Sequence, residues 1–289
     1  MLKRWIACAL LFLPLAGAAG AQPGAEDWAR YPAANEVQLR DLVAIVRVTP
    51  QARQDVALAI HNPGPLPDPE LRSARNRLIV DGKQRGIRSC HGQGDDFSVH
   101  LARHGRLRAD QLPILEIRVP QNAIISTSGA VRLQVGAAQA AQISVAGCGD
   151  AELESVAGAA DITVTGSSAL RLFQAGSARV TIAGSGDVQL GAVLEGLAAS
   201  IAGAGDLQAA RVDGPTNIAV QGAGDVVIRD GRASVLTVVI AGAGDVVHNG
   251  SAERLDVTIV GAGDVRVRRV EGEINRRVLG SGDVRVSER

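Results

Sequence analysis

A Gly-x-Gly-Asp motif recurs along the second half of the chain, and its spacing constrains the fold more than any other feature. Successive Asp residues lie 37, 19, 19, 20, 19 and 19 positions apart, and a degenerate copy, Gly166-Ser167-Ser168-Ala169, fills the double-length first gap. A constant period near nineteen residues indicates one supersecondary unit stacked on itself, which is a solenoid. The aspartates of the motif are Asp150, Asp187, Asp206, Asp225, Asp245, Asp264 and Asp283.

Aliphatic residues alternate with small or polar ones on both sides of the motif. The positions one and three residues after each Asp, and seven and five before it, are mostly Val, Ile, Leu or Ala. A period of two is typical of strands, which β-branched residues favour. A third, shorter apolar site follows at Val156, Val193, Val212 and Val270. We therefore predict an all-β fold, a single-stranded right-handed parallel β-helix with rungs of about 19 residues and an N-terminal β cap.

The motif itself is predicted to form the corner of each rung. Gly reaches positive φ and permits close backbone approach, and Asp accepts backbone N–H bonds in an Asx-type turn. Unbroken alternation directs the Asp row toward solvent. The alternative is a calcium site, but calcium takes six to eight oxygen ligands and each turn supplies one carboxylate. We favour a structural turn and predict no metal and no cofactor.

The N-terminus has the features of a secretory signal peptide over residues 1–21. Lys3-Arg4 forms the basic region, Trp5 to Leu15 the apolar stretch, and Ala19-Gly20-Ala21 the cleavage site. We expect a leader at 22–36, an N-terminal β cap at 37–120 and the β-helix at 121–289. Within the cap we expect strands at 42–48, 56–60, 78–81, 97–101 and 114–119, the last of which is alternatively the first rung.

Export leaves two cysteines, Cys90 and Cys148, for an oxidising compartment. We predict a disulfide between them, which would tie the cap to the first intact motif. Two unrelated buried thiols are the alternative.

The charge balance limits the choice of partners. Without Lys3 and Arg4 the chain carries 28 basic and 30 acidic residues, and this near-neutral balance argues against nucleic acid. We expect no membrane span once the signal peptide is removed. The expected location is the periplasm or the cell surface.

No set of residues predicts catalysis. Polysaccharide lyases and hydrolases need differently placed carboxylates or a basic residue beside them, and no such cluster stands out. We expect His248 to be a tolerated, partly buried side chain at an inward position. Cys90-His91 and the pair His100 and His104 lack the spacing that completes a zinc site. The basic run is predicted to be a solvated loop face; it comprises Arg103, Arg106 and Arg108.

The repeated Gly-Ser/Ala-Gly-Asp-Val turns, the Leu-x-Ile-x-Val-Pro strand that ends at Pro120 and the N-terminal signal resemble the putative auto-transporter adhesin head GIN domain family. The likeness covers roughly residues 38–289. It implies a single-stranded right-handed β-helix on the bacterial cell envelope.

These observations predict a non-enzymatic binding, adhesion or scaffold module whose partner is an envelope or extracellular polysaccharide or a protein. Two alternatives stay open. One is a polysaccharide-active enzyme on a β-helix. The other is self-association through the C-terminal edge, where Arg276 breaks the inward pattern of the last rung. The charges of the kind that blunt an exposed strand there are Arg285, Glu288 and Arg289.

Overall fold

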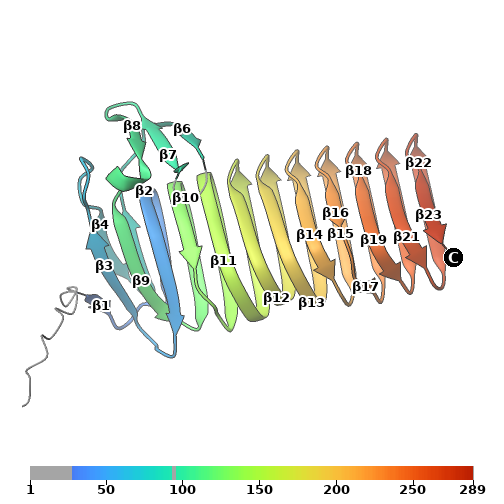
Figure 1. Cartoon of the computed structure of the whole chain (residues 1–289), viewed down its shortest axis with the longest axis horizontal. Coiled ribbons are helices and arrows are strands. Elements are labelled where there is room, and N and C mark those ends of the chain that lie inside the picture. The colour runs from blue at the N-terminus through green and yellow to red at the C-terminus, as the bar shows by residue number, and fades with distance from the viewer. Residues whose placement is uncertain (1–27, 93–95, 289) are drawn as a thin grey trace, which may run out of the picture.

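The computed structural model describes residues 28–92 and 96–288. The chain forms a rod of coils lying side by side, with the N-terminal part at one end and a small extra sheet on one edge (Figure 1). The predicted signal peptide and residues 22–27 of the predicted leader lie outside the described residues. Within the described ranges, no helix combines the length and the apolar character needed to cross a membrane.

Strands account for nearly all of the regular structure. The N-terminal part contains β1 (Ala29–Tyr31), β2 (Glu36–Gln51), β3 (Val56–His61), β4 (Glu70–Ala74), β5 (Arg77–Asp81), β6 (Ile87–His91), β7 (Ser98–Leu101), β8 (Gly105–Arg108), the 3-10 helix η2 (Ala109–Gln111) and β9 (Ile114–Pro120). Long strands that bend through the corners follow: β10 (Asn122–Val135), β11 (Ala140–Gly166), β12 (Ala169–Gly184) and β13 (Asp187–Gly203). The later coils contain β14 (Leu207–Val212), β15 (Thr216–Gly222), β16 (Val226–Ile228), β17 (Arg232–Ala233), β18 (Leu236–Gly242), β19 (Val246–Ala252), β20 (Leu255–Gly261), β21 (Val265–Val270), β22 (Ile274–Gly280) and β23 (Val284–Glu288).

Each coil carries one stretch of strand before its glycines and another after them. The strands before the glycines pair in parallel from coil to coil, as β15 does with β18 and β18 with β20. Those after the glycines do the same, as β16 does with β19 and β19 with β21. Val226 therefore lies beside Val246, and Val246 beside Val265. The solenoid with rungs of about 19 residues is confirmed.

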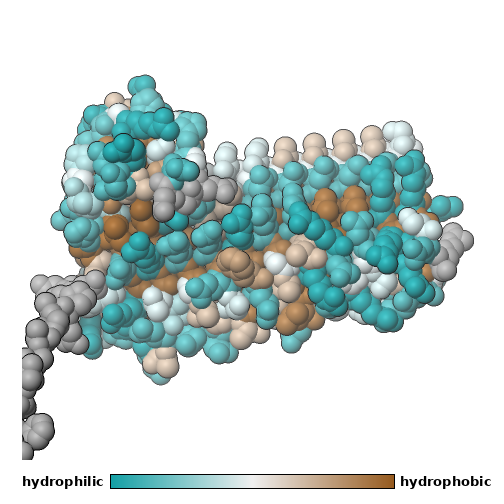
Figure 2. Space-filling model, viewed as in Figure 1, coloured by the Kyte–Doolittle hydropathy of each residue, from teal (hydrophilic) through white to brown (hydrophobic). Residues whose placement is uncertain are grey.

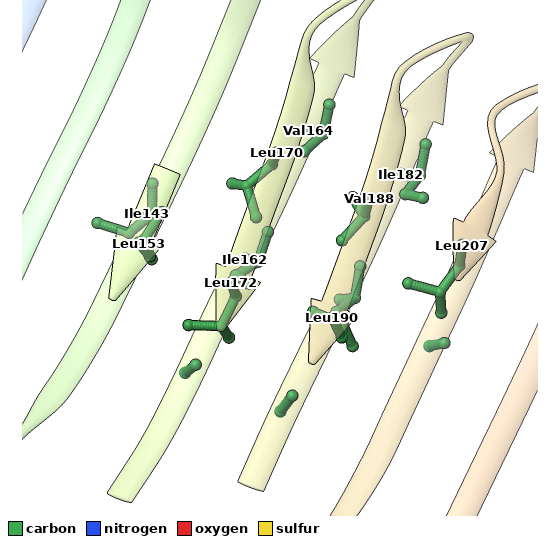
Figure 3. Packing of buried hydrophobic residues seen from close by; sticks show 14 of the residues in the cluster. Ile143, Leu153, Ile162, Val164, Leu170, Leu172, Ile182, Val188, Leu190 and Leu207 are labelled. Carbon is green, nitrogen blue, oxygen red and sulfur yellow. The ribbon is translucent and has the colours of Figure 1, made fainter. Parts of the chain in front are cut away.

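The aliphatic positions of the repeat fill the interior of the rod. At the position after each Asp, side-chain exposure is 2% or less in every coil before the last, where Val284 is 8% exposed. Ile143, Ile162 and their counterparts point into the same column from the strands before the glycines (Figure 3). The third apolar site is buried too, at Val156, Val193, Val212 and Val270. One continuous aliphatic core runs through the coils.

The N-terminal end of this core is covered by antiparallel strands. β2 is the first strand to run the length of a coil, and it pairs in parallel with β10 on one side and with β5 and β9 on the other. Beyond these, β4 pairs antiparallel with β5, β3 with β9, and β1 with β3. An open parallel edge would invite strand addition, and the antiparallel strands occupy it. The strands expected in this region are present, whereas the division of domains at residue 120 stays a prediction.

Residues 82–113, named the insertion below, interrupt the coil that β5 and β9 share. β5 aligns with the first part of β2 and β9 with the second, and between these parts β2 bends at Asp41, where φ is 43°. Leu42 lies beside Gly129 of β10, which lies beside Gly147 of the first intact motif. The insertion therefore leaves the rod at the same corner as the glycine motifs. It contains the three-stranded antiparallel sheet of β6, β7 and β8.

The last coil departs from the inward pattern. Arg276 lies beside Val257, at an inward position, and is exposed together with most of β22. The predicted association of rods through this edge stays a prediction.

The two glycines of the motif are required for different reasons. The first adopts positive φ, for example 139° at Gly222, a conformation that residues with a Cβ rarely adopt. The second lies against the preceding coil: a Cβ on Gly224 would be 2.1 Å from the carbonyl oxygen of Gly205. Between them Ala223 projects outward and is exposed. The corners form a row of pale, weakly polar residues along the upper edge of the rod (Figure 2).

Substitution of the second glycine tests this close approach. We expect Gly224→Ala to lower the free energy of unfolding by about 2–4 kcal/mol, because the backbone of two coils must separate. Ala223→Ser, one residue away on the exposed tip, is the matched control and should change it by less than about 0.5 kcal/mol. Urea denaturation of both variants measures the difference. Equal stability of the two variants would contradict the packing described.

Candidate binding surfaces

The aspartates of the motif form a ladder along the corner. The backbone N–H of Asp225 donates to Oδ1 of Asp206 at 2.9 Å, and that of Asp245 donates to Oδ1 of Asp225 at 2.8 Å. The same bond joins Asp187 to the N–H of Asp206, Asp245 to that of Asp264, and Asp264 to that of Asp283. The carboxylate thus bonds to the neighbouring coil rather than closing the local Asx turn that sequence reasoning suggested. The Asp side chain therefore has a structural role, because its hydrogen bond links one coil to the next.

Arginines accompany the ladder at both ends. Arg266 lies between two rungs, with Nη1 3.3 Å from Oδ2 of Asp245 and Nη2 2.8 Å from Oδ2 of Asp264. At the start of the row Arg132 lies beside Asp150, and the two side chains form a largely buried ion pair with 3.9 Å between Nε and Oδ2. The degenerate copy places Ala169 between Asp150 and Asp187, so the carboxylate row is interrupted for one coil.

The residues considered for metal binding do not gather into a ligand set. Within residues 28–92 and 96–288, no group of three His, Cys, Asp or Glu side chains could hold an ion. In the coils from Asp187 to Asp264, one carboxylate oxygen of each ladder residue already accepts a backbone N–H. A calcium ion needs six to eight oxygens, which one remaining oxygen per coil does not supply.

Cys90 and Cys148 form the predicted disulfide. Cys90 belongs to β6 of the insertion, and Cys148 occupies the tip of the first glycine corner. The bond closes a segment of 58 residues. Closing a loop of this length restricts the unfolded chain and stabilises the folded state by about 4 kcal/mol. The insertion is therefore held covalently against the first coils.

His248 is buried completely rather than partly. It lies at an inward position between Ile228 and Val267, with no exposed surface. The N–H of Gly250 donates to its Nδ1 at 3.1 Å, so Nδ1 is an acceptor and the ring is neutral. Burial lowers the pKa of the imidazole below its ordinary value. The inward position of His248 in the repeat indicated complete burial, but because histidine is polar we expected only partial burial.

The remaining sites from the sequence lie on the insertion. Arg106 and Arg108 belong to β8 and Arg103 to the turn before it, and all three are exposed. His100 lies directly beside Arg106 across β7 and β8, and His104 is in the same turn as Arg103. The arginine run is thus mostly strand, where a loop was expected.

A second surface consists of the outward positions between the aliphatics of the strands that precede the glycines. Two rows of these residues run across six coils in strand register, and none of them is charged or buried. We name this surface the uncharged face: Thr163, Thr181, Ser200, Ala219, Val239 and Thr258 in one row, and Thr165, Ala183, Ala202, Gln221, Ala241 and Val260 in the other.

The uncharged face contains a shallow depression of about 210 Å³. Ser200, Ala219 and Val239 of the face line it together with the charged Arg179. Val239 and Val260 are exposed, at 43% and 49%. Charges lie outside these two rows: Asp161, Arg179 and Asp256 in the next outward row of the same strands, and residues such as Arg171 and Arg266 on the strands after the glycines. Alternation identified these positions as outward, but not as an uncharged row.

Comparison with known proteins gives a family and a fold. The chain matches the family described as putative auto-transporter adhesin, head GIN domain, over residues 115–211 and 209–289. No curated protein sequence matches. A crystal structure of a putative adhesin from Parabacteroides distasonis ATCC 8503 is similar, with a TM-score of 0.52, 14% identity and coverage of 91% of this chain and 97% of that one. A putative adhesin from Bacteroides fragilis NCTC 9343 has a TM-score of 0.43, 16% identity and coverage of 92% and 100%.

The ladder predicts how stability responds at Asp225. We expect Asp225→Ala to lower the free energy of unfolding by about 1–2 kcal/mol, because the N–H of Asp245 loses its acceptor. Asp225→Asn keeps an acceptor oxygen and should retain most of that stability. Denaturant unfolding of both variants separates the hydrogen bond from the charge. A larger loss for Asn than for Ala would contradict the role assigned to Oδ1.

Burial of neutral His248 predicts a pH dependence. Because its pKa is lower in the folded than in the unfolded protein, the folded state loses stability as pH falls below about 6.5, by at most 1.4 kcal/mol per pH unit. His248→Val should remove this part of the loss, and His61→Gln, at an exposed histidine, should not. Urea midpoints at pH 7.5 and 5.5 measure it. An unchanged pH dependence in His248→Val would contradict a neutral buried ring.

Proposed function

We propose that this chain, which belongs to the putative auto-transporter adhesin, head GIN domain family, is a non-enzymatic binding module of the cell envelope that attaches through its uncharged face. The predicted signal peptide and the Cys90–Cys148 disulfide support export to the periplasm or the cell surface. The partner we propose is an envelope or extracellular polysaccharide or a protein.

The observation that carries this proposal is the absence of charge from two neighbouring outward rows, twelve positions in all, across six of the described coils. Five coil spacings give the face a length of about 24 Å. Charged side chains are costly to desolvate, and the cores of binding interfaces are depleted in them. Hydroxyls of Thr181 and Ser200 beside Ala219 and Val239 offer both hydrogen bonds and apolar contact in one row.

The solenoid makes this face rigid. Each residue of the two rows belongs to a strand paired on both sides, from Thr181 and Ala183 to Ala241. Ser, Thr, Ala and Val side chains have few rotamers to lose on binding. Because the surface is already ordered before binding, little conformational entropy is lost when a partner binds, and shallow contacts suffice for attachment.

A charged side chain in the depression tests the proposal. The chain from residue 22 onward is applied to an array of envelope polysaccharides, extracellular glycans and proteins. We expect Ala219→Arg to weaken the observed binding by about tenfold or more, since it introduces a charge that must be desolvated. Gln208→Arg, on an outward position of the strands after the glycines, is the matched control and should bind as the unmodified chain does. Equal loss in both variants, or no ligand on the array, would overturn the proposal.

A further inference from the structure

The insertion differs from the rest of the chain in its charge. Residues 82–113 contain six Lys and Arg residues against three Asp, and three of the five histidines of the whole chain. The whole chain, in contrast, has 30 basic and 30 acidic residues. All of the basic side chains of this segment are exposed: Lys83, Arg85, Arg88, Arg103, Arg106 and Arg108. Hydrophilic residues accordingly dominate the surface over β6, β7 and β8 (Figure 2).

The sheet of the insertion has an apolar side and a cationic side. Phe97, Val99, Leu101 and Leu107 are buried at 3% or less in a cluster that includes residues of β2 and β10. The positions between them project outward, as His100 and Arg106 do from paired strands. The disulfide to the first coil fixes the sheet at its β6 strand. The cations are therefore displayed on a platform that is already ordered.

A cleft of about 610 Å³ lies beside this platform, and two of its three acidic groups have cationic partners, whereas Asp68 accepts from the Asn62 amide. Glu70 pairs with Lys83 and Arg72, and Asp81 lies 3.9 Å from Arg72 and accepts the N–H of Lys83. On the opposite wall Arg103 and His104, from the β7–β8 turn, line the same cleft.

Three of the six cations have no carboxylate partner. Among the described residues, Arg88, Arg103 and Arg106 form no ion pair, and Arg106 donates to the Ser98 hydroxyl. Arg85 pairs with Asp41 and Arg108 with Asp110. An exposed guanidinium without a carboxylate partner retains its full capacity for a charged ligand. The net charge of the insertion is positive.

We propose that the sheet of β6, β7 and β8, here named the platform, and the cleft beside it bind an acidic polysaccharide, a sugar chain that carries carboxylates along its length. This surface is distinct from the uncharged face, and its ligand is narrowed to a polysaccharide that carries negative charge. Guanidinium groups pair with carboxylates through two parallel hydrogen bonds. β6 and β8 lie two strand spacings apart, about 9.6 Å, so Arg88 and Arg106 present two separate guanidinium groups to one extended anionic chain.

Two other anionic partners fit the platform less well. Single-stranded nucleic acid is held by bases stacked on exposed aromatic rings, but Phe97 is the one aromatic residue of the insertion and is buried. Proteins bind a bilayer surface through exposed apolar side chains that insert into it beside basic side chains. In the described part of the insertion no large apolar side chain is exposed. A hydrophilic polymer with one negative charge per sugar unit fits a surface that is basic and has no exposed large apolar or aromatic side chain among its described residues.

Polygalacturonate is the probe for the test. Binding of the chain from residue 22 onward is measured on immobilised polygalacturonate and on uncharged dextran, at 0.05 and 0.3 M salt. We expect binding to polygalacturonate that weakens with salt, and none to dextran. Arg88→Gln with Arg103→Gln should weaken it about tenfold or more, through the loss of two charge-assisted contacts.

The matched control removes the same charge elsewhere. Arg268→Gln with Arg269→Gln changes two exposed arginines on β21 and should leave binding within about twofold of the unmodified chain. Both double variants should keep the disulfide and the unfolding midpoint. Equal weakening by the two pairs, no binding to polygalacturonate, or tighter binding to single-stranded DNA or to vesicles with anionic phospholipid would each overturn the proposal. The array with Ala219→Arg fails or succeeds independently, because that residue lies outside the insertion.

Discussion

The structure depends on how closely one coil approaches the next at the glycine corner. A Cβ on any second glycine from Gly205 to Gly282 would lie 2.1–2.2 Å from a carbonyl oxygen of the preceding coil. Because no side chain fits there, the two backbones come into contact and the strands on both sides enter the same register. That register places aliphatic residues above aliphatic residues, and one core results. The Asp ladder adds one hydrogen bond per coil at the same corner.

Much of this architecture can be predicted from the sequence, because the same pattern of aliphatic residues and glycines recurs from repeat to repeat. The period gives the coil, alternation gives the inward set, and glycine marks the corner; all three are visible from Val226 to Val265 without coordinates. The disulfide was predicted because export leaves two cysteines, Cys90 and Cys148, for an oxidising compartment, and the bond is present.

Features that depend on contacts between segments far apart in the sequence were not predictable. β2 precedes β5 and β9 in the sequence yet lies between them and β10, an order that no local pattern encodes. The bond from the Asp225 carboxylate to the neighbouring coil follows from three-dimensional stacking, whereas the sequence suggested a local turn. The complete burial of the polar His248 could be predicted only if it were known that its Nδ1 accepts a hydrogen bond from the N–H of Gly250. The excess of basic residues in the insertion is visible in the sequence, but only the structure places Arg88, Arg106 and Arg108 on one sheet.

The division of labour between core and surface follows from the same constraint. Since glycine contacts and inward aliphatics fix the coil, the outward positions are free to differ between faces, and they do: one face is uncharged and the other carries Arg171 and Arg266. Amide hydrogen exchange tests the central claim most directly. If coils are stacked through the corner, the N–H groups of Asp206, Asp225, Asp245 and Asp264 exchange as slowly as those of the adjoining strands. Exchange at the rate of an open loop, while the strands stay protected, would contradict it.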